Sequence, residues 1–170
     1  MMVKISTIGL LIVPIAVGLS IFAVAAEKHI VGWIEIVSIY PGNMKIKAKL
    51  DTGARNSSLN AKKLIEFERN GERWVRFDLT NWKGRIETFE AKVNRTAKIK
   101  QLGQEADSRQ VIKLGICIGG TYKEVEVNLE DRSGFNYQML VGRSFLKGSF
   151  IVDPELSFTI KPNCQGVSGQ

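Results

Sequence analysis

The stretch from Met44 to Asp51 constrains the fold of this chain more than any other. Apolar residues alternate with three lysines over Met44–Leu50, and a period of two is the pattern of a β-strand with one buried and one exposed face. The strand runs directly into Asp51-Thr52-Gly53, and the stretch Ser57–Ala61 that follows has the composition of a returning strand. The sequence therefore predicts a carboxylate on a tight turn at the end of a buried strand.

Further strand-like stretches, separated by turn residues, fill the rest of the chain. Ile30–Ile39 is apolar and ends at Pro41-Gly42-Asn43, and Asn70-Gly71 joins two strand-like arms within Leu64–Leu79 as a tight hairpin. The last strands are expected in Ser149–Asp153 and Leu156–Ile160, on either side of a turn. Only the segment after Gly142 has room for about one helical turn. This pattern predicts an all-β domain, a small barrel or sandwich.

The N-terminus has the features of a targeting segment. Lys4 precedes the uncharged run Ile5–Val24, and Ala23-Val24-Ala25 fits the small-x-small pattern of a cleavage site. We expect a signal peptide at residues 1–25, a folded domain at 27–160 and a flexible tail at 161–170. The alternative is an uncleaved anchor, since the apolar run is about as long as a bilayer requires. Either way the domain is expected to be periplasmic or exported, with membrane contact only through this segment.

Charge and ligand-forming residues narrow the function classes. The net charge of +7 suits an acidic substrate or an anionic surface, but Lys and Arg are spread among 17 acidic residues, so no nucleic-acid partner is predicted. His29 is the single histidine and no phosphate-binding glycine loop is present, so the sequence predicts neither a metal site nor a cofactor. The sequence leaves open whether Cys117 and Cys164 pair in an oxidising compartment.

Asp51 is the candidate for chemistry. Gly53 permits the turn and leaves a backbone N–H free to donate to the carboxylate. Two such carboxylates about 3 Å apart share one proton, so one can activate water while the other polarises a peptide carbonyl. The alternative is an ordinary surface turn. The alternating strand before Asp51, the returning strand after it and the later apolar run Met139–Val141, which ends at Gly142, argue against that alternative.

These stretches carry a family resemblance. The "LDTGA" and "LVGRSFL" segments are similar to the two active-site motifs of retroviral-type aspartic proteases. The longer pattern resembles a bacterial family of retropepsin-like peptidases, often labelled ATP-dependent zinc proteases and of DUF785 type. The matching residues are Gly32 and Glu35, Ile46–Ala61, Glu72–Phe77 and Leu140–Pro154. The resemblance implies a closed or partly open acid-protease barrel with one short helix near the C-terminus.

The resemblance also implies roles for individual residues. Asp51 is the expected catalytic aspartate of an aspartic endopeptidase that forms its Asp dyad across a homodimer. Support of the active-site loop is expected from Thr52, Gly53, Ala54, Gly142 and Arg143. The retroviral partner of Arg143 is an acid, but Arg55 stands in its place, so Arg143 is expected to pair with another carboxylate such as Asp131 or Asp153.

Substrate contacts are expected on the same loop and from a hairpin above it. Arg55, Asn56 and Ser57 are the candidates for substrate binding, with Arg55 open to two interpretations, as an anchor for an acidic substrate or as a solvated loop charge. The flap is expected at residues 86–118, with its tip near Lys100–Ser108. The family's association with glutamate-adding ligases implies a peptide or protein substrate that is acidic or glutamate-rich. The alternative function is a non-catalytic binding or regulatory module that keeps the fold.

Overall fold

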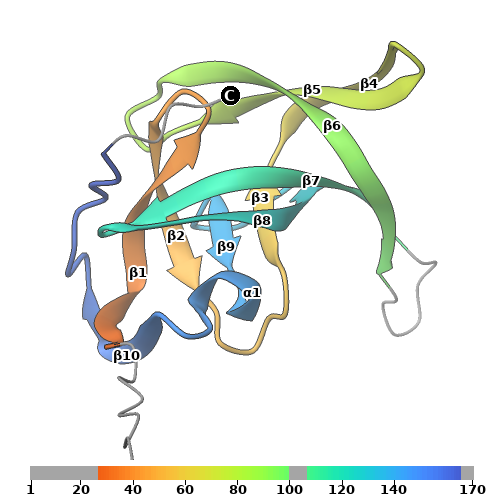
Figure 1. Cartoon of the computed structure of the whole chain (residues 1–170). Coiled ribbons are helices and arrows are strands. Elements are labelled where there is room, and N and C mark those ends of the chain that lie inside the picture. Colours follow the sequence, from red (N-terminus) through yellow and green to blue (C-terminus); the bar gives the residue numbers. More distant parts are fainter. Residues whose placement is uncertain (1–26, 100–106, 166–170) are drawn as a thin grey trace, which may run out of the picture.

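The computed structural model describes residues 27–99 and 107–165, and the predicted signal segment lies outside them. The described residues form a mostly β structure with a single short helix (Figure 1). None of their helices has the length and apolar character needed to cross a membrane. The elements are β1 (His29–Tyr40), β2 (Met44–Leu50), β3 (Ser57–Asn60), β4 (Lys62–Arg69), β5 (Glu72–Thr80), β6 (Ile86–Ile99), β7 (Asp107–Ile118), β8 (Thr121–Glu130), β9 (Met139–Val141), α1 (Arg143–Leu146) and β10 (Phe150–Ser157).

Six strands close into a barrel, which confirms the predicted fold class. The strands follow one another in the order β1-β2-β9-β3-β8-β7, and β7 pairs back to β1 through Ser38 opposite Cys117. The alternating stretch Met44–Leu50 is strand β2, with its apolar side chains buried in the barrel. The loop from β2 to β3 therefore lies at the lower end of the barrel, beside α1 (Figure 1).

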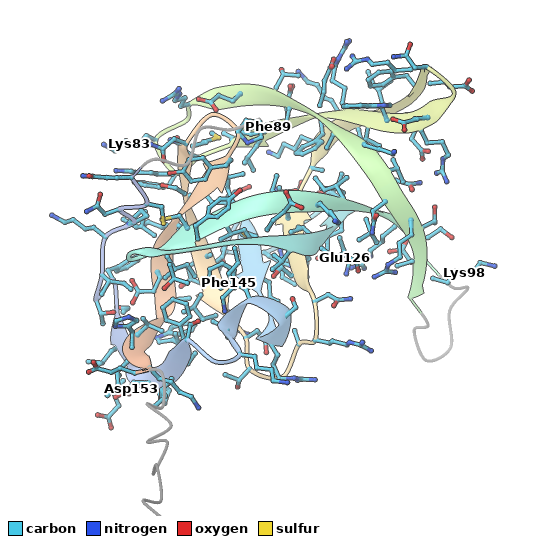
Figure 2. The ribbon with its side chains drawn as sticks, in the orientation of Figure 1. Lys83, Phe89, Lys98, Glu126, Phe145 and Asp153 are labelled. Atoms are coloured by element: carbon cyan, nitrogen blue, oxygen red, sulfur yellow. A yellow bond between two sulfur atoms is a disulfide. The ribbon has the colours of Figure 1, made fainter. Side chains whose placement is uncertain are left out.

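The helix α1 closes the barrel end next to this loop. Phe145 and Leu146 of α1 are buried, and the ring of Phe145 stacks on that of Phe150 at 5.8 Å between centroids. In Figure 2 Phe145 lies among the barrel strands, whereas Asp153 lies at the lower edge of the molecule. Burying large apolar side chains of this kind is the main favourable contribution to folding, so α1 is held firmly against the barrel.

Three further strands extend the sheet beyond β7 and form an arm. The strands β6, β5 and β4 follow β7 in order, and β4 forms the edge of the sheet. The predicted hairpin turn joins β4 to β5, with Asn70 and Gly71 both at positive φ. The predicted flap hairpin is also present as the antiparallel pair β6–β7. Residues 100–106, most of its expected tip, lie outside the described residues.

The last strand of the chain differs from the sequence-based expectation. The Asp153-Pro154 pair lies within one strand, β10, and does not separate two strands. The register between β1 and β10 shifts beyond Gly32, and an irregular edge strand is a place where a sheet tolerates proline. β10 pairs in parallel with the start of β1.

Residues 161–165, the described part of the expected tail, contact the barrel. Cys164 forms a disulfide with Cys117 of β7, and the backbone N–H of Asn163 donates to the carbonyl of Gly119. The tyrosine hydroxyl of Tyr40 donates to the carbonyl of Cys164. These contacts tie the segment to the barrel, and residues 166–170 lie outside the described residues.

Candidate active site

Asp51 lies on the turn that the sequence predicts. Its Oδ1 accepts hydrogen bonds from the backbone N–H groups of Gly53, at 2.9 Å, and Ala54, at 3.2 Å. Its own backbone N–H donates to the carbonyl of Val141 in β9, at 2.9 Å. The side chain is 27% exposed. Two backbone donors fix one carboxylate oxygen, while the second lies 3.7 Å from Nζ of Lys49.

The second loop crosses directly beneath this turn at Gly142. A Cβ atom on Gly142 would lie 2.5 Å from the carbonyl oxygen of Asn56 and 3.0 Å from that of Ala54. The backbone N–H of Gly142 also donates to Oγ of Ser57. The backbone of Gly142 is extended, so glycine is required here by the close approach of two backbones.

We expect Gly142→Ala to destabilise the protein by about 1–3 kcal/mol, because the added methyl group forces the two loops apart. The same displacement moves the Asp51 turn, so peptide hydrolysis should fall in the fraction that remains folded. Urea denaturation measures the first effect. Gly120→Ala is the matched control, because no atom lies within 4 Å of a Cβ added there. Equal midpoints for the two variants would contradict the steric argument.

Arg143 supports the turn through carbonyl oxygens. Its Nη1 donates to the carbonyls of Thr52, at 2.9 Å, and Gly53, at 2.6 Å. The expected pairing with Asp131 or Asp153 is therefore corrected: those carboxylates accept from Ser133 and from the backbone of Glu155. The guanidinium can satisfy carbonyls as well as carboxylates, because it carries five N–H donors.

The far end of α1 is held by Lys123 of β8. Its Nζ donates to the carbonyl of Phe145, at 2.7 Å, and to that of Lys147, at 3.1 Å. Burial lowers the pKa of Lys123. A cation at the C-terminal carbonyls of a helical turn is favourable, so Lys123 fixes α1 and, through Arg143, the active-site turn.

A cleft of about 450 Å³ opens beside Asp51. Its walls come from the ends of β1, β2 and β9 and from the loop between β8 and β9. Asp51 is the one acidic residue among those that line it. The lining residues are Trp33, Lys49, Asp51, Arg132, Phe135, Asn136, Tyr137 and Leu140.

The structure separates the predicted site residues into two groups. Thr52, Gly53, Ala54, Gly142 and Arg143 gather around Asp51 as loop support. Arg55, Asn56 and Ser57 are not among the residues that line the cleft. Arg55 is exposed, while Ser57 is fully buried and its Oγ accepts a hydrogen bond from the backbone N–H of Gly142.

Two basic residues of the cleft were missed. Lys49 lies two residues before Asp51 and shares its face of the strand, with Nζ 3.7 Å from Oδ2 of Asp51. That spacing could have identified Lys49. Arg132 reaches the cleft from the loop between β8 and β9, and no local pattern in the sequence marks it.

The geometry agrees with comparisons to known proteins. The RimB-like family, described as retropepsin-like aspartic endopeptidase RimB, matches residues 30–163. This chain belongs to the RimB-like family. The match spans the barrel strands, the Asp51 turn, the Gly142 loop and Cys117, and ends one residue before Cys164.

Parts of larger proteins are also similar to this chain. A probable alpha-L-glutamate ligase of Shewanella pealeana is 40% identical over 140 residues, which cover 79% of this chain and 30% of the ligase. A protein of the same description from Parasynechococcus marenigrum is 31% identical over 135 residues, covering 76% of this chain and 28% of that protein. The chain thus spans under a third of the length of these curated relatives.

A solved structure has the same fold. A Legionella pneumophila protein of unknown function (DUF785) superposes with a TM-score of 0.69 and 33% identity, covering 79% of this chain and all of that one.

Within residues 27–99 and 107–165, no three His, Cys, Asp or Glu side chains gather closely enough to hold a metal ion.

Proposed function

We propose that this chain is an aspartic endopeptidase in which two copies each contribute one Asp51. The observation that carries the proposal is the accessible carboxylate of Asp51, held by two backbone N–H groups on a turn crossed by the Gly142 loop. The membership in a retropepsin-like family supports it. The reaction is hydrolysis by a water molecule that one ionised aspartate activates.

The need for two copies follows from the chemistry of the cleft. Activating water and polarising the peptide carbonyl requires two carboxyl groups that share a proton, and Asp51 is the one acid that lines the described cleft. Thr52 and Gly53 are exposed at the tip of the turn, where a two-fold axis would bring two turns together. The substrate would lie in the shared cleft as an extended strand.

The proposed substrate is an acidic, glutamate-containing peptide. The proposed location of the protein is periplasmic or exported. The net charge of +7 is compatible with an acidic chain. Several relatives that are similar to this chain over part of their length are described as probable alpha-L-glutamate ligases. That description supports glutamate as a component of the proposed substrate. A non-catalytic binding module remains the second function, and it predicts a protein that does not hydrolyse peptides.

Mixing wild-type protein with Asp51→Asn tests the shared dyad. If subunits exchange freely, one equivalent of the variant places about half of the wild-type subunits in mixed dimers. Hydrolysis of a peptide library should therefore fall to about half of its value without the variant. Unchanged hydrolysis would show that each copy acts alone. Bovine albumin at equal concentration is the control for dilution and adsorption.

A further inference from the structure

We infer that Arg132, assisted by Lys49, is the residue that recognises a substrate carboxylate beside Asp51. The inference rests on the proposed function and deepens it, because it assigns the selectivity for acidic side chains to a named pocket. Both residues line the cleft with Asp51. The positions of the surrounding groups carry the argument.

Arg132 is a nearly buried cation with a fixed orientation. The residue is 6% exposed, and its Nη1 donates to Oγ of Ser58, at 2.9 Å, and to Oε1 of Glu130, at 2.7 Å. Its backbone N–H donates to Oδ1 of Asn60. The ring of Phe135 covers the guanidinium at 4.3 Å. Such a preorganised guanidinium loses little freedom when it binds a ligand.

The charge that compensates Arg132 is shared within a network of two guanidiniums and two carboxylates. Its carboxylate partner Glu130 is shared with Arg109, which forms a second ion pair with it. The other partner of Arg109 is Asp107, whose side chain is 48% exposed. A buried cation that shares one carboxylate with another cation favours a further anion, because burial makes an uncompensated charge costly.

One nitrogen of the Arg132 guanidinium, Nη2, is available for that anion. Nη1 donates to Ser58 and Glu130, and Nε donates to the carbonyl of Tyr137 at 3.5 Å. Among the described residues, no acceptor bonds Nη2. The N–H groups of Nη2 can therefore donate to a carboxylate, and such charge-assisted hydrogen bonds are strong.

The remaining walls suit the rest of a glutamate side chain. Trp33 and Tyr137 meet edge to face at 6.0 Å and supply apolar surface for methylene groups. Lys49 adds a second cation on a flexible stem next to Asp51. The cleft therefore offers two cations and apolar walls. It fits a carboxylate side chain of a residue next to the scissile bond.

A binding experiment in the Asp51→Asn background separates this inference from catalysis. The probes are a soluble carrier peptide ending in six α-linked glutamates and the same peptide with six glutamines, measured by fluorescence anisotropy. We expect the glutamate probe to bind roughly ten- to a hundredfold more tightly. Adding Arg132→Met should reduce this ratio roughly tenfold or more. Arg76→Met, which removes a guanidinium bonded to Glu90 on the arm, is the charge-matched control.

Further variants distinguish a role of Arg132 in binding from a role in folding alone. Lys49→Met alters a side chain that is 44% exposed, so the fold should tolerate it, and it should also reduce the ratio. Arg132→Lys keeps the charge but loses the fork, and should fall between Arg132→Met and the parent. The inference would be overturned if the ratio of the two probe affinities stayed unchanged both in Lys49→Met and in folded Arg132 variants. It would also be overturned if the parent showed no preference for the glutamate probe. A preference that depends on Arg132 in a protein that hydrolyses nothing would overturn the proposed peptidase and keep this pocket.

Discussion

Asp51→Asn should lower the kcat of peptide hydrolysis by roughly 10³- to 10⁴-fold, since in a homodimer one substitution removes both carboxyl groups of the dyad. Asparagine keeps the shape of the turn and one oxygen that can accept from the N–H groups of Gly53 and Ala54. The fold should therefore remain intact. A continuous fluorogenic peptide assay, scanned over pH with and without EDTA, measures the effect.

Two outcomes of that assay would contradict the dyad. Hydrolysis that survives Asp51→Asn would place the chemistry on another residue. Hydrolysis that EDTA removes would place it on a metal ion. Asp131→Asn is the matched control, because this aspartate is also exposed and also accepts from a backbone N–H group, that of Ser133, but does not line the cleft. We expect it to leave the rate unchanged.

Local patterns of the sequence predicted the part of the site that is built from consecutive residues. The alternation over Met44–Leu50 predicted strand β2 and the position of Asp51 at its end. The family resemblance, which the glycine-ended run before Arg143 helps to carry, implied that Gly142 supports the Asp51 loop, and Gly142 lies close beneath the turn. In these cases the period of the pattern and the stereochemistry of glycine determine the local structure.

The rest depends on contacts between distant segments, for which no local pattern exists. Arg132 bonds Ser58 across 74 residues of sequence, and Glu35 bonds Thr159 across 124. The disulfide joins cysteines 47 residues apart, and a count of two cysteines shows only that pairing is feasible. The partners of Arg143 were missed for a different reason. Carbonyl groups are present at every residue, so a sequence cannot mark them as the acceptors of a particular side chain.

Substitution of Glu35 is expected to lower the stability of the fold strongly. The side chain is fully buried, and Oε1 accepts from the backbone N–H of Gly32 at 2.8 Å and from the N–H and hydroxyl of Thr159 at 3.0 and 2.6 Å. We expect Glu35→Ala to lower the free energy of unfolding by about 3–5 kcal/mol, because one buried and two partly buried hydrogen bonds lose their acceptor and a cavity forms. Chemical denaturation in urea measures the loss.

The physical reason is that Glu35 fastens the end of the chain across β1. The backbone N–H of Phe158 donates to the carbonyl of Ile34, and β10 pairs with β1 up to Ile34, so the segment after β10 is held beside Glu35. Glu35→Gln keeps the volume and one acceptor oxygen, and should cost less than Glu35→Ala. Glu68→Ala, on the exposed edge strand β4, should change the midpoint little, since an exposed glutamate makes a small net contribution. A Glu35→Ala midpoint within error of that of Glu68→Ala would mean that the donors of Thr159 find new acceptors, and that this carboxylate does not secure the end of the chain.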